Sequence, residues 1–161
     1  NRMFFDTPAY RKALFAFAAA GKGIVMLHPG TWYAFPNWPE LNAKLVGGGS
    51  RGHDKLGPYS VNVLKADHPI TRGVPAKFEV TDELYYVNAE PEKIPAGTAA
   101  IEVLAESSPS IKFGKPHPVV WITRHDTAKV VGLTLGHDER THDHPAFKTL
   151  LVNSVKWVSG K

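Results

Sequence analysis

Four residues able to carry acid–base or metal chemistry stand at the ends of apolar runs or in short polar turns: His28, His53, Glu83 and His137. Imidazole and carboxylate groups transfer protons, and both also bind divalent ions such as zinc. We expect His28, Glu83 and His137 to be catalytic. We expect His28, His53 and His137 to be metal ligands, with zinc or a similar divalent ion as the cofactor.

The positions of two of these histidines favour a functional role. His28 ends the apolar run 24–27, and His137 follows the run 130–135 and Gly136. In open α/β sheets, ligands bind beyond the carboxyl ends of the strands, which is where both side chains are expected. The alternative for His28 is a histidine that hydrogen-bonds a neighbouring loop.

The segment that begins at His137 is unusually rich in ionisable groups. Residues 137–144 contain three histidines and three acidic residues, which is dense enough to suggest a metal or acid–base site. The spacing is not H-E-x-x-H, so it does not match that zinc-protease motif. His142 is a further candidate, whereas Asp143 is expected to cap the last helix.

Glu83 and His53 have weaker sequence support. Glu83 is followed by apolar and aromatic residues, which can shift the pKa of a carboxyl group, but the alternative is a solvated turn acid. His53 lies in the glycine-rich stretch 48–54, where the backbone can approach a ligand closely.

Aromatic residues cluster directly after His28. Side chains of this kind stack on the apolar face of a sugar ring, although packing in the core is the commoner role of any one of them. The residues expected to bind substrate are Trp32, Tyr33, Trp38, Tyr85 and Asp138.

Several classes of chemistry are excluded or disfavoured. The chain of 161 residues has no cysteine, so it has no disulfide, thiolate metal site or cysteine nucleophile. The glycine-rich stretch lacks the G-K-[ST] ending of a phosphate-binding loop, and no G-x-S-x-G motif is present, so neither a nucleotide cofactor nor a serine triad is expected. The net charge of +4 is scattered, which argues against nucleic acid as a partner, and no apolar run suits a membrane span.

The elements expected to position these residues alternate between helix and strand. Thr7 and Pro8 predict the start of a first helix, which ends near Gly21. Residues 24–27 predict a strand buried on both faces, and Asn37 with Glu40 predicts a capping box for a helix over 38–46. Further strands are expected at 59–63, 78–80, 100–105, 118–123 and 129–135, and a final helix at 145–158. We expect one domain over 1–161 that lacks N-terminal strands of the full fold.

The same residues carry a family resemblance. Residues 21–28, G-K-G-I-V-M-L-H, resemble a strand motif of the ThuA-like (trehalose-utilisation) family, and 39–40 with 45–48 resemble its W-P-E and L-V-G-G segments. D-H-P-I-T-R-G-V-P at 67–75, D-E-L-Y at 82–85 and L-G-H-D at 135–138 are similar to further motifs. Residues 145–157 resemble the closing helix of the family.

This resemblance implies a class I glutamine-amidotransferase-like, flavodoxin-like three-layer α/β sandwich. It also implies a role in sugar catabolism and a metal ion in some members. Glutamine hydrolysis is excluded, because no cysteine is present.

We therefore expect a metal-assisted isomerase, lyase or hydrolase acting on a disaccharide or 3-keto sugar. The alternative is a non-catalytic carbohydrate-binding or accessory domain. The expected partner is a small-molecule sugar, with a homo-oligomer and the compartment left open.

Overall fold

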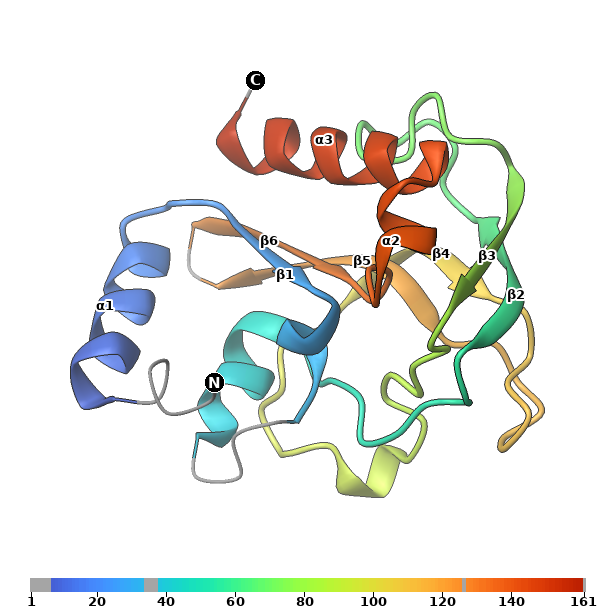
Figure 1. Ribbon diagram of the computed structural model, residues 1–161. Coiled ribbons are helices and arrows are strands. Elements are labelled where there is room, and N and C mark those ends of the chain that lie inside the picture. Colours follow the sequence, from blue (N-terminus) through green and yellow to red (C-terminus); the bar gives the residue numbers. More distant parts are fainter. Residues whose placement is uncertain (1–6, 34–37, 126, 161) are drawn as a thin grey trace.

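The computed structural model describes residues 7–33, 38–125 and 127–160 (Figure 1). Two longer helices and six strands form its framework. The helices are α1 (Pro8–Ala19), the short α2 (Glu139–His142) and α3 (Pro145–Ser159), with 3-10 turns η2 (His28–Thr31) and η4 (Pro91–Lys93) and the π-helix η3 (Leu41–Val46). The strands are β1 (Ile24–Leu27), β2 (Gly57–Val63), β3 (Lys77–Asp82), β4 (Glu102–Ser107), β5 (Pro118–His125) and β6 (Ala128–Leu133).

The six strands form one mixed sheet in the order β1-β6-β5-β4-β2-β3. β1 and β6 are parallel, with Leu27 opposite Leu133, and every other neighbouring pair is antiparallel. Four antiparallel steps lead from β6 to β3, so β3 runs in the same direction as β6 and β1. The carboxyl ends of these three strands consequently point the same way.

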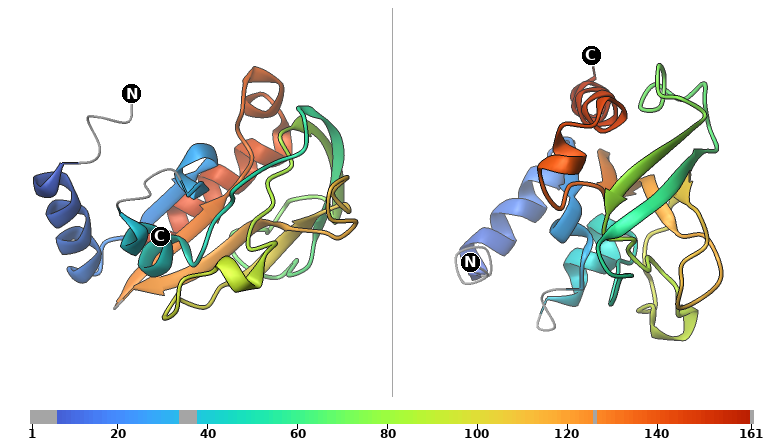
Figure 2. Two further views of the ribbon diagram at one scale, coloured as in Figure 1. Left: turned by 90° about the horizontal axis from the view of Figure 1, so that it is seen from below. Right: turned by 45° about the vertical axis from the view of Figure 1, so that its right-hand side comes forward.

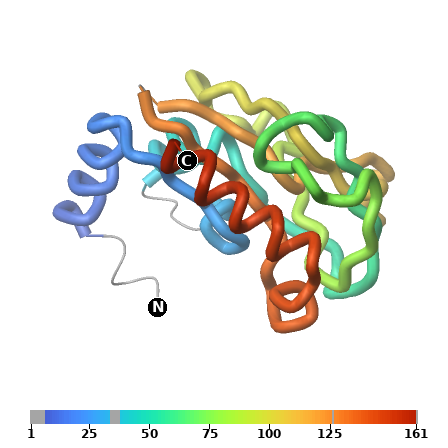
Figure 3. The backbone as a smooth tube through the Cα atoms, turned by 90° about the horizontal axis from the view of Figure 1, so that it is seen from above, coloured from blue at the N-terminus to red at the C-terminus, as the bar shows by residue number. Residues whose placement is uncertain are grey.

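Helices cover both faces of the sheet where β1 and β6 pair. Val25 and Leu27 pack in the cluster that contains Phe147 of α3, whereas Ile24 and Met26 face the cluster of α1 and η3. This alternation follows from the two-residue repeat of a strand. Figures 2 and 3 show α3 lying across one face, with η3 on the other. The predicted α/β class is therefore confirmed, as a mixed sheet between helical layers.

The predicted strands and the two longer helices all form, with small shifts at their ends. The strand 24–27 differs from expectation, because its four residues are only partly buried at the edge of the described sheet.

Thr7 caps α1 as predicted, its hydroxyl accepting from the Tyr10 N–H at 3.2 Å. The N-cap of α3 is His144 and not Asp143, which instead ends α2 and pairs with Lys148. The predicted cap Asn37 lies outside the described residues. No helix in the described part of the chain is long and apolar enough to cross a membrane.

A tryptophan fixes η3 against the sheet, and a glycine makes room for it. Trp121 of β5 is fully buried, and its indole N–H donates to the Val46 carbonyl oxygen at 2.8 Å. Gly132 lies opposite it on β6, where an added Cβ would come within 2.1 Å of the indole ring. The absence of a side chain at residue 132 is therefore what allows the ring to lie flat on the sheet.

Gly132→Ala should destabilise the protein by roughly 1–3 kcal/mol, because the rigid indole ring has to move to admit a methyl group. The matched control is Gly57→Ala in β2, where the added Cβ would meet its nearest neighbour, the Lys55 carbonyl oxygen, at an ordinary 3.5 Å. Urea unfolding of both variants measures the difference. Equal stability of the two variants would contradict this account of residue 132.

Candidate metal and acid–base site

The central side chains of the site follow the carboxyl ends of three strands that run in the same direction. His28 directly follows β1, Glu83 directly follows β3, and His137 comes four residues after β6. His53 reaches the same place from a two-stranded ribbon, in which segment 49–54 pairs with 84–88 through the bridge between His53 and Tyr85. All four predicted acid–base or metal residues are thus brought together.

Glu83 is the centre of the cluster. Its Oε2 lies 3.5 Å from Nε2 of His28 and 3.3 Å from Nδ1 of His137, while Oε1 lies 3.7 Å from Nε2 of His53. The side chains of His28 and Glu83 are 8% and 17% exposed, against 38% for His137. His137 therefore forms the solvent side of the cluster and His28 its floor.

The protonation pattern of two imidazoles is set by main-chain carbonyl groups. Nδ1–H of His28 donates to the Thr134 oxygen at 2.6 Å, and Nδ1–H of His53 donates to the Asp54 oxygen at 2.8 Å. A carbonyl oxygen only accepts, so in the neutral imidazoles the lone pair is on Nε2 and faces Glu83. The two Nε2 lone pairs therefore lie close to the carboxylate of Glu83.

His28 is held in an unfavourable backbone conformation. Its φ is +42°, in the left-handed region that residues other than glycine rarely adopt. Tyr85 adds a hydrogen bond from its hydroxyl to Nε2 of His28 at 3.2 Å. Burial, followed by the charges of Glu83 and Asp82, raises the pKa of Tyr85, so this phenol stays neutral and can act as a donor. Backbone strain of this kind is characteristic of functional sites.

The donor set fits a divalent metal ion. One ligand atom each from His28, Glu83 and His137 lie within 4.8 Å of one another. Bonds of 2.0–2.1 Å in tetrahedral coordination place neighbouring ligand atoms about 3.3 Å apart, close to the two separations from Oε2. The bond from His28 to a main-chain oxygen is the outer contact that metal-binding histidines usually make. This group of possible ligand atoms contains Glu83 with His28 and His137, whereas the expected ligand set contained His53.

A buried carboxylate positions two of these residues. Asp82 is fully buried, and its Oδ1 accepts from the Glu83 N–H at 2.7 Å while Oδ2 accepts from the Gly136 N–H at 2.8 Å. The ends of β3 and β6 are thereby joined next to Glu83 and His137. Sequence reasoning did not select Asp82, although it stands beside Glu83 at the end of an alternating strand.

The expected substrate-binding residues divide into two groups. Trp32 and Tyr85 lie at the cluster, since the indole ring is 5.7 Å from His53 and 5.4 Å from Tyr85. Tyr33 instead packs under the guanidinium group of Arg51, 3.6 Å from its ring centre.

The other two expected substrate residues have structural partners. Trp38 is buried in the apolar cluster of α1 and η3, where its ring contacts Phe15. Asp138 caps α2 and pairs with Arg140, whose hydrogen bond is the main reason that the pKa of Asp138 is lowered to about 2. His142, the further candidate, lies beside Gly136, with its Nε2 3.0 Å from the Gly136 oxygen.

The fold and the cluster together define an α/β protein with a histidine–carboxylate site suited to a divalent metal. The chain belongs to the ThuA family: the family model described as trehalose utilisation matches residues 3–158. A comparison with curated proteins finds no match.

Solved structures agree with this assignment. A ThuA-like protein from Bacteroides uniformis is 27% identical with a TM-score of 0.77, and the match covers 97% of this chain and 66% of that one. A ThuA-like protein from Parabacteroides merdae is 21% identical with a TM-score of 0.79, over 96% of this chain and 66% of that one. This chain therefore spans about two thirds of the length of each relative. A β-galactosidase from Bacillus circulans shares the fold at 17% identity and a TM-score of 0.59, over 95% of this chain and 21% of that one.

Asp82→Asn should lower the free energy of unfolding by roughly 1–3 kcal/mol, because an amide offers one acceptor where two buried N–H groups need one each. Asp143→Asn is the control, since Asp143 is 78% exposed and pairs only with Lys148 among the described contacts. Chemical denaturation measures both, and a neutral effect of Asp82→Asn would contradict the bridging role.

Stability should fall as pH rises from about 10 to about 12, in part because of Tyr86. Burial, then the hydrogen bond to Asp54, raises the pKa of Tyr86 to about 12, against about 10 in the unfolded chain. A raised folded pKa stabilises below pH 10 and is lost as pH rises through the folded value. Tyr86→Phe should make this decline shallower in unfolding curves recorded across the range. An unchanged slope would contradict the assignment.

Proposed function

We propose that this protein is a metal-assisted enzyme acting on a disaccharide or 3-keto sugar, with its reaction centre at His28, Glu83 and His137. The observation that carries this proposal is the convergence of two imidazole lone pairs and one carboxylate in a partly shielded cluster. The family description, trehalose utilisation, supports a sugar as the substrate. The proposed ligands are His28 Nε2, Glu83 Oε2 and His137 Nδ1.

A divalent metal bound there would polarise a carbonyl or hydroxyl oxygen of the sugar. His53 and Glu83 are the proposed acid–base groups. Nε2 of His53 holds a lone pair in the neutral form and is 3.7 Å from Oε1 of Glu83, so either group can take a proton from the carbon next to the sugar carbonyl. Abstraction of this proton is common to isomerisation and elimination of a 3-keto glycoside, and hydrolysis of the glycoside is the third reaction that we consider.

Two aromatic residues complete the proposed substrate site. Trp32 lies against both His53 and Tyr85 and offers an apolar surface for a pyranose ring. The Tyr85 hydroxyl donates to Nε2 of His28 in this structure, and a metal ion bound to that nitrogen would leave the hydroxyl free to donate to the sugar. Trp38 takes no part in this proposal, because it packs in the core.

His137→Ala should lower metal affinity and kcat/KM by at least about 100-fold, since it removes a proposed ligand at the solvent side of the cluster. The measurements are metal analysis of the purified protein and turnover of 3-keto-trehalose and 3-keto-glucosides. His125→Ala, at the far end of β5, is the matched control and should keep both properties.

The alternative, a non-catalytic carbohydrate-binding domain, predicts a different result. Wild-type protein would then bind the sugar without any turnover, with or without added divalent metal. That outcome would overturn the enzyme proposal and leave only a binding role for Trp32 and Tyr85.

A further inference from the structure

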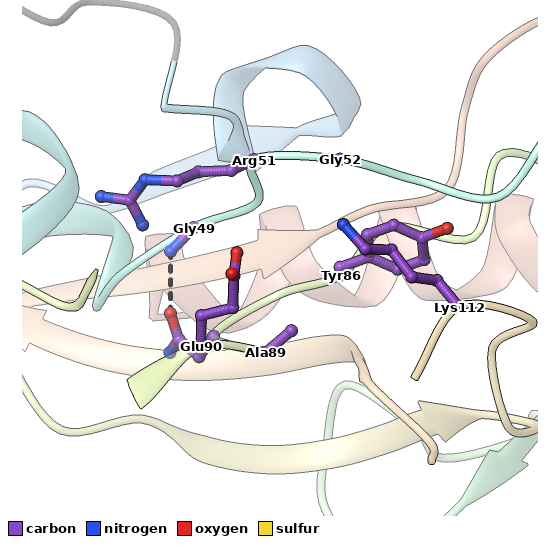
Figure 4. Close-up of a pocket in the computed structure, with 8 residues that line it drawn as sticks. Gly49, Arg51, Gly52, Tyr86, Ala89, Glu90 and Lys112 are labelled. Atoms are coloured by element: carbon purple, nitrogen blue, oxygen red, sulfur yellow. Dashed lines mark hydrogen bonds between the residues drawn. The ribbon is translucent and has the colours of Figure 1, made fainter. Parts of the chain in front are cut away.

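A second pocket lies on the reverse side of the ribbon that carries His53. Within the ribbon, His53 and Tyr85 form one face toward Glu83, whereas Gly52 and Tyr86 form the other. Gly52 and Tyr86 of this other face line the pocket (Figure 4), and no residue of the histidine–carboxylate cluster does. It is lined by Gly49, Arg51, Gly52, Tyr86, Asn88, Ala89, Glu90 and Lys112.

The side chain of Asn88 fixes the glycine-rich segment beside the pocket through hydrogen bonds to its main chain. Asn88 has a φ of +52°, and its side chain accepts from the Gly49 N–H and donates to the Gly47 oxygen, both at 3.0 Å. An added Cβ at Gly52 would come within 3.1 Å of the Tyr86 ring. The space above Tyr86 therefore depends on glycine at this position, which is the usual condition for a close approach of backbone to a ligand.

Positive charge is in excess around this pocket. Arg51 and Lys112 line it; Lys93 pairs with Glu90, and Lys115 donates to the Ala89 oxygen at 3.0 Å. Two carboxylates oppose these four cations, Glu90 within the pocket and Asp54 behind Tyr86, so two positive charges are left in excess.

Three of these cations influence the carboxyl group of Glu90. The hydrogen bond from Lys93, and then the charges of Lys93, Lys112 and Arg51, lower the pKa of Glu90. In Figure 4 the carboxylate of Glu90 lies between the side chains of Arg51 and Lys112. Lys93 thus pairs directly with this carboxylate, Arg51 is held nearby by its bond to the Lys93 oxygen at 3.0 Å, and cationic groups of this kind recognise oxyanions.

We propose that this pocket is an oxyanion site, which binds a small molecule bearing a phosphate or carboxylate group beside Arg51 and Lys112, over the ring of Tyr86. The site is independent of the proposed sugar chemistry. Lys112 Nζ is 5.8 Å from the centre of the Tyr86 ring, so the ring offers the apolar wall and the lysine the charge. The Tyr86 hydroxyl donates to Asp54 and is therefore not expected to bind the anion.

Titration with inorganic phosphate, followed by amide-resolved NMR, tests the proposal. We expect shifts at Gly49 and Gly52 with a Kd on the order of 1 mM. Lys112→Gln should weaken binding by about 3- to 10-fold, and Glu90→Gln should tighten it by a similar factor, because one removes an attracting and the other a repelling charge. The size of these two effects, compared with the same charge changes elsewhere on the surface, separates this pocket from general surface charge.

Lys77→Gln and Glu79→Gln on β3 are the matched controls, since they change the net charge equally on an exposed strand. Both should leave the affinity within about twofold of wild type, given the distance dependence of the charge effect. The proposal is overturned if the controls change the affinity as much as the pocket variants do, or if phosphate causes no shift at Gly49 and Gly52.

Further titrations identify which ligand chemistry the pocket prefers and test whether phosphate binds at the histidine–carboxylate cluster instead. Glucose 6-phosphate, gluconate and unmodified glucose compare a phosphate ester, a carboxylate and a neutral sugar. At least one of the two anions should bind more tightly than glucose at this pocket, and equal binding of all three would contradict the proposal. In His137→Ala protein the phosphate affinity should be unchanged, whereas binding at the metal cluster would be weakened.

Discussion

The buried carboxylate of Asp82 is the constraint on which the rest of the site depends. It accepts the N–H groups of Glu83 and Gly136, which belong to segments far apart in the chain and at opposite sides of the sheet order. A polar group with no exposure, such as this one, is tolerated in a protein interior when its oxygens are hydrogen-bonded. The bridge therefore stabilises the curvature that brings the end of β3 to the end of β6.

Main-chain carbonyl groups give the cluster its chemical character. By accepting from Nδ1 of His28 and of His53, they direct the lone pair of each neutral imidazole toward Glu83. The same three groups with free side-chain rotation would form ordinary ion pairs on a surface. The fixed tautomers orient these groups in advance, and preorganisation of this kind is what both metal binding and acid–base catalysis require.

The two-stranded ribbon of residues 49–54 and 84–88 contributes side chains to both the histidine–carboxylate cluster and the cationic pocket. Its alternation places His53 and Tyr85 on the side of the cluster and Tyr86 on the side of the cationic pocket. Asp54 touches both, because its main-chain oxygen accepts from His53 and its carboxylate accepts from Tyr86. The glycines of residues 47–52 permit this close packing on both faces.

The order of the elements, the α/β class and the residues of the cluster could be read from the sequence, because each depends on local patterns. Apolar runs ending in His28 and near His137 mark strand ends, and the aromatic and apolar neighbours of Glu83 mark it as a candidate. The burial of Trp38 and the pairing of Asp138 with Arg140 could not be foreseen, since an aromatic or acidic residue has the same sequence appearance in a core, a cap or a site. Only the tertiary structure decided that the sheet is mixed, that Asp82 joins two strand ends and that four cations gather behind the ribbon. These features depend on contacts between residues distant in the chain, and the local sequence does not encode which distant residues will meet.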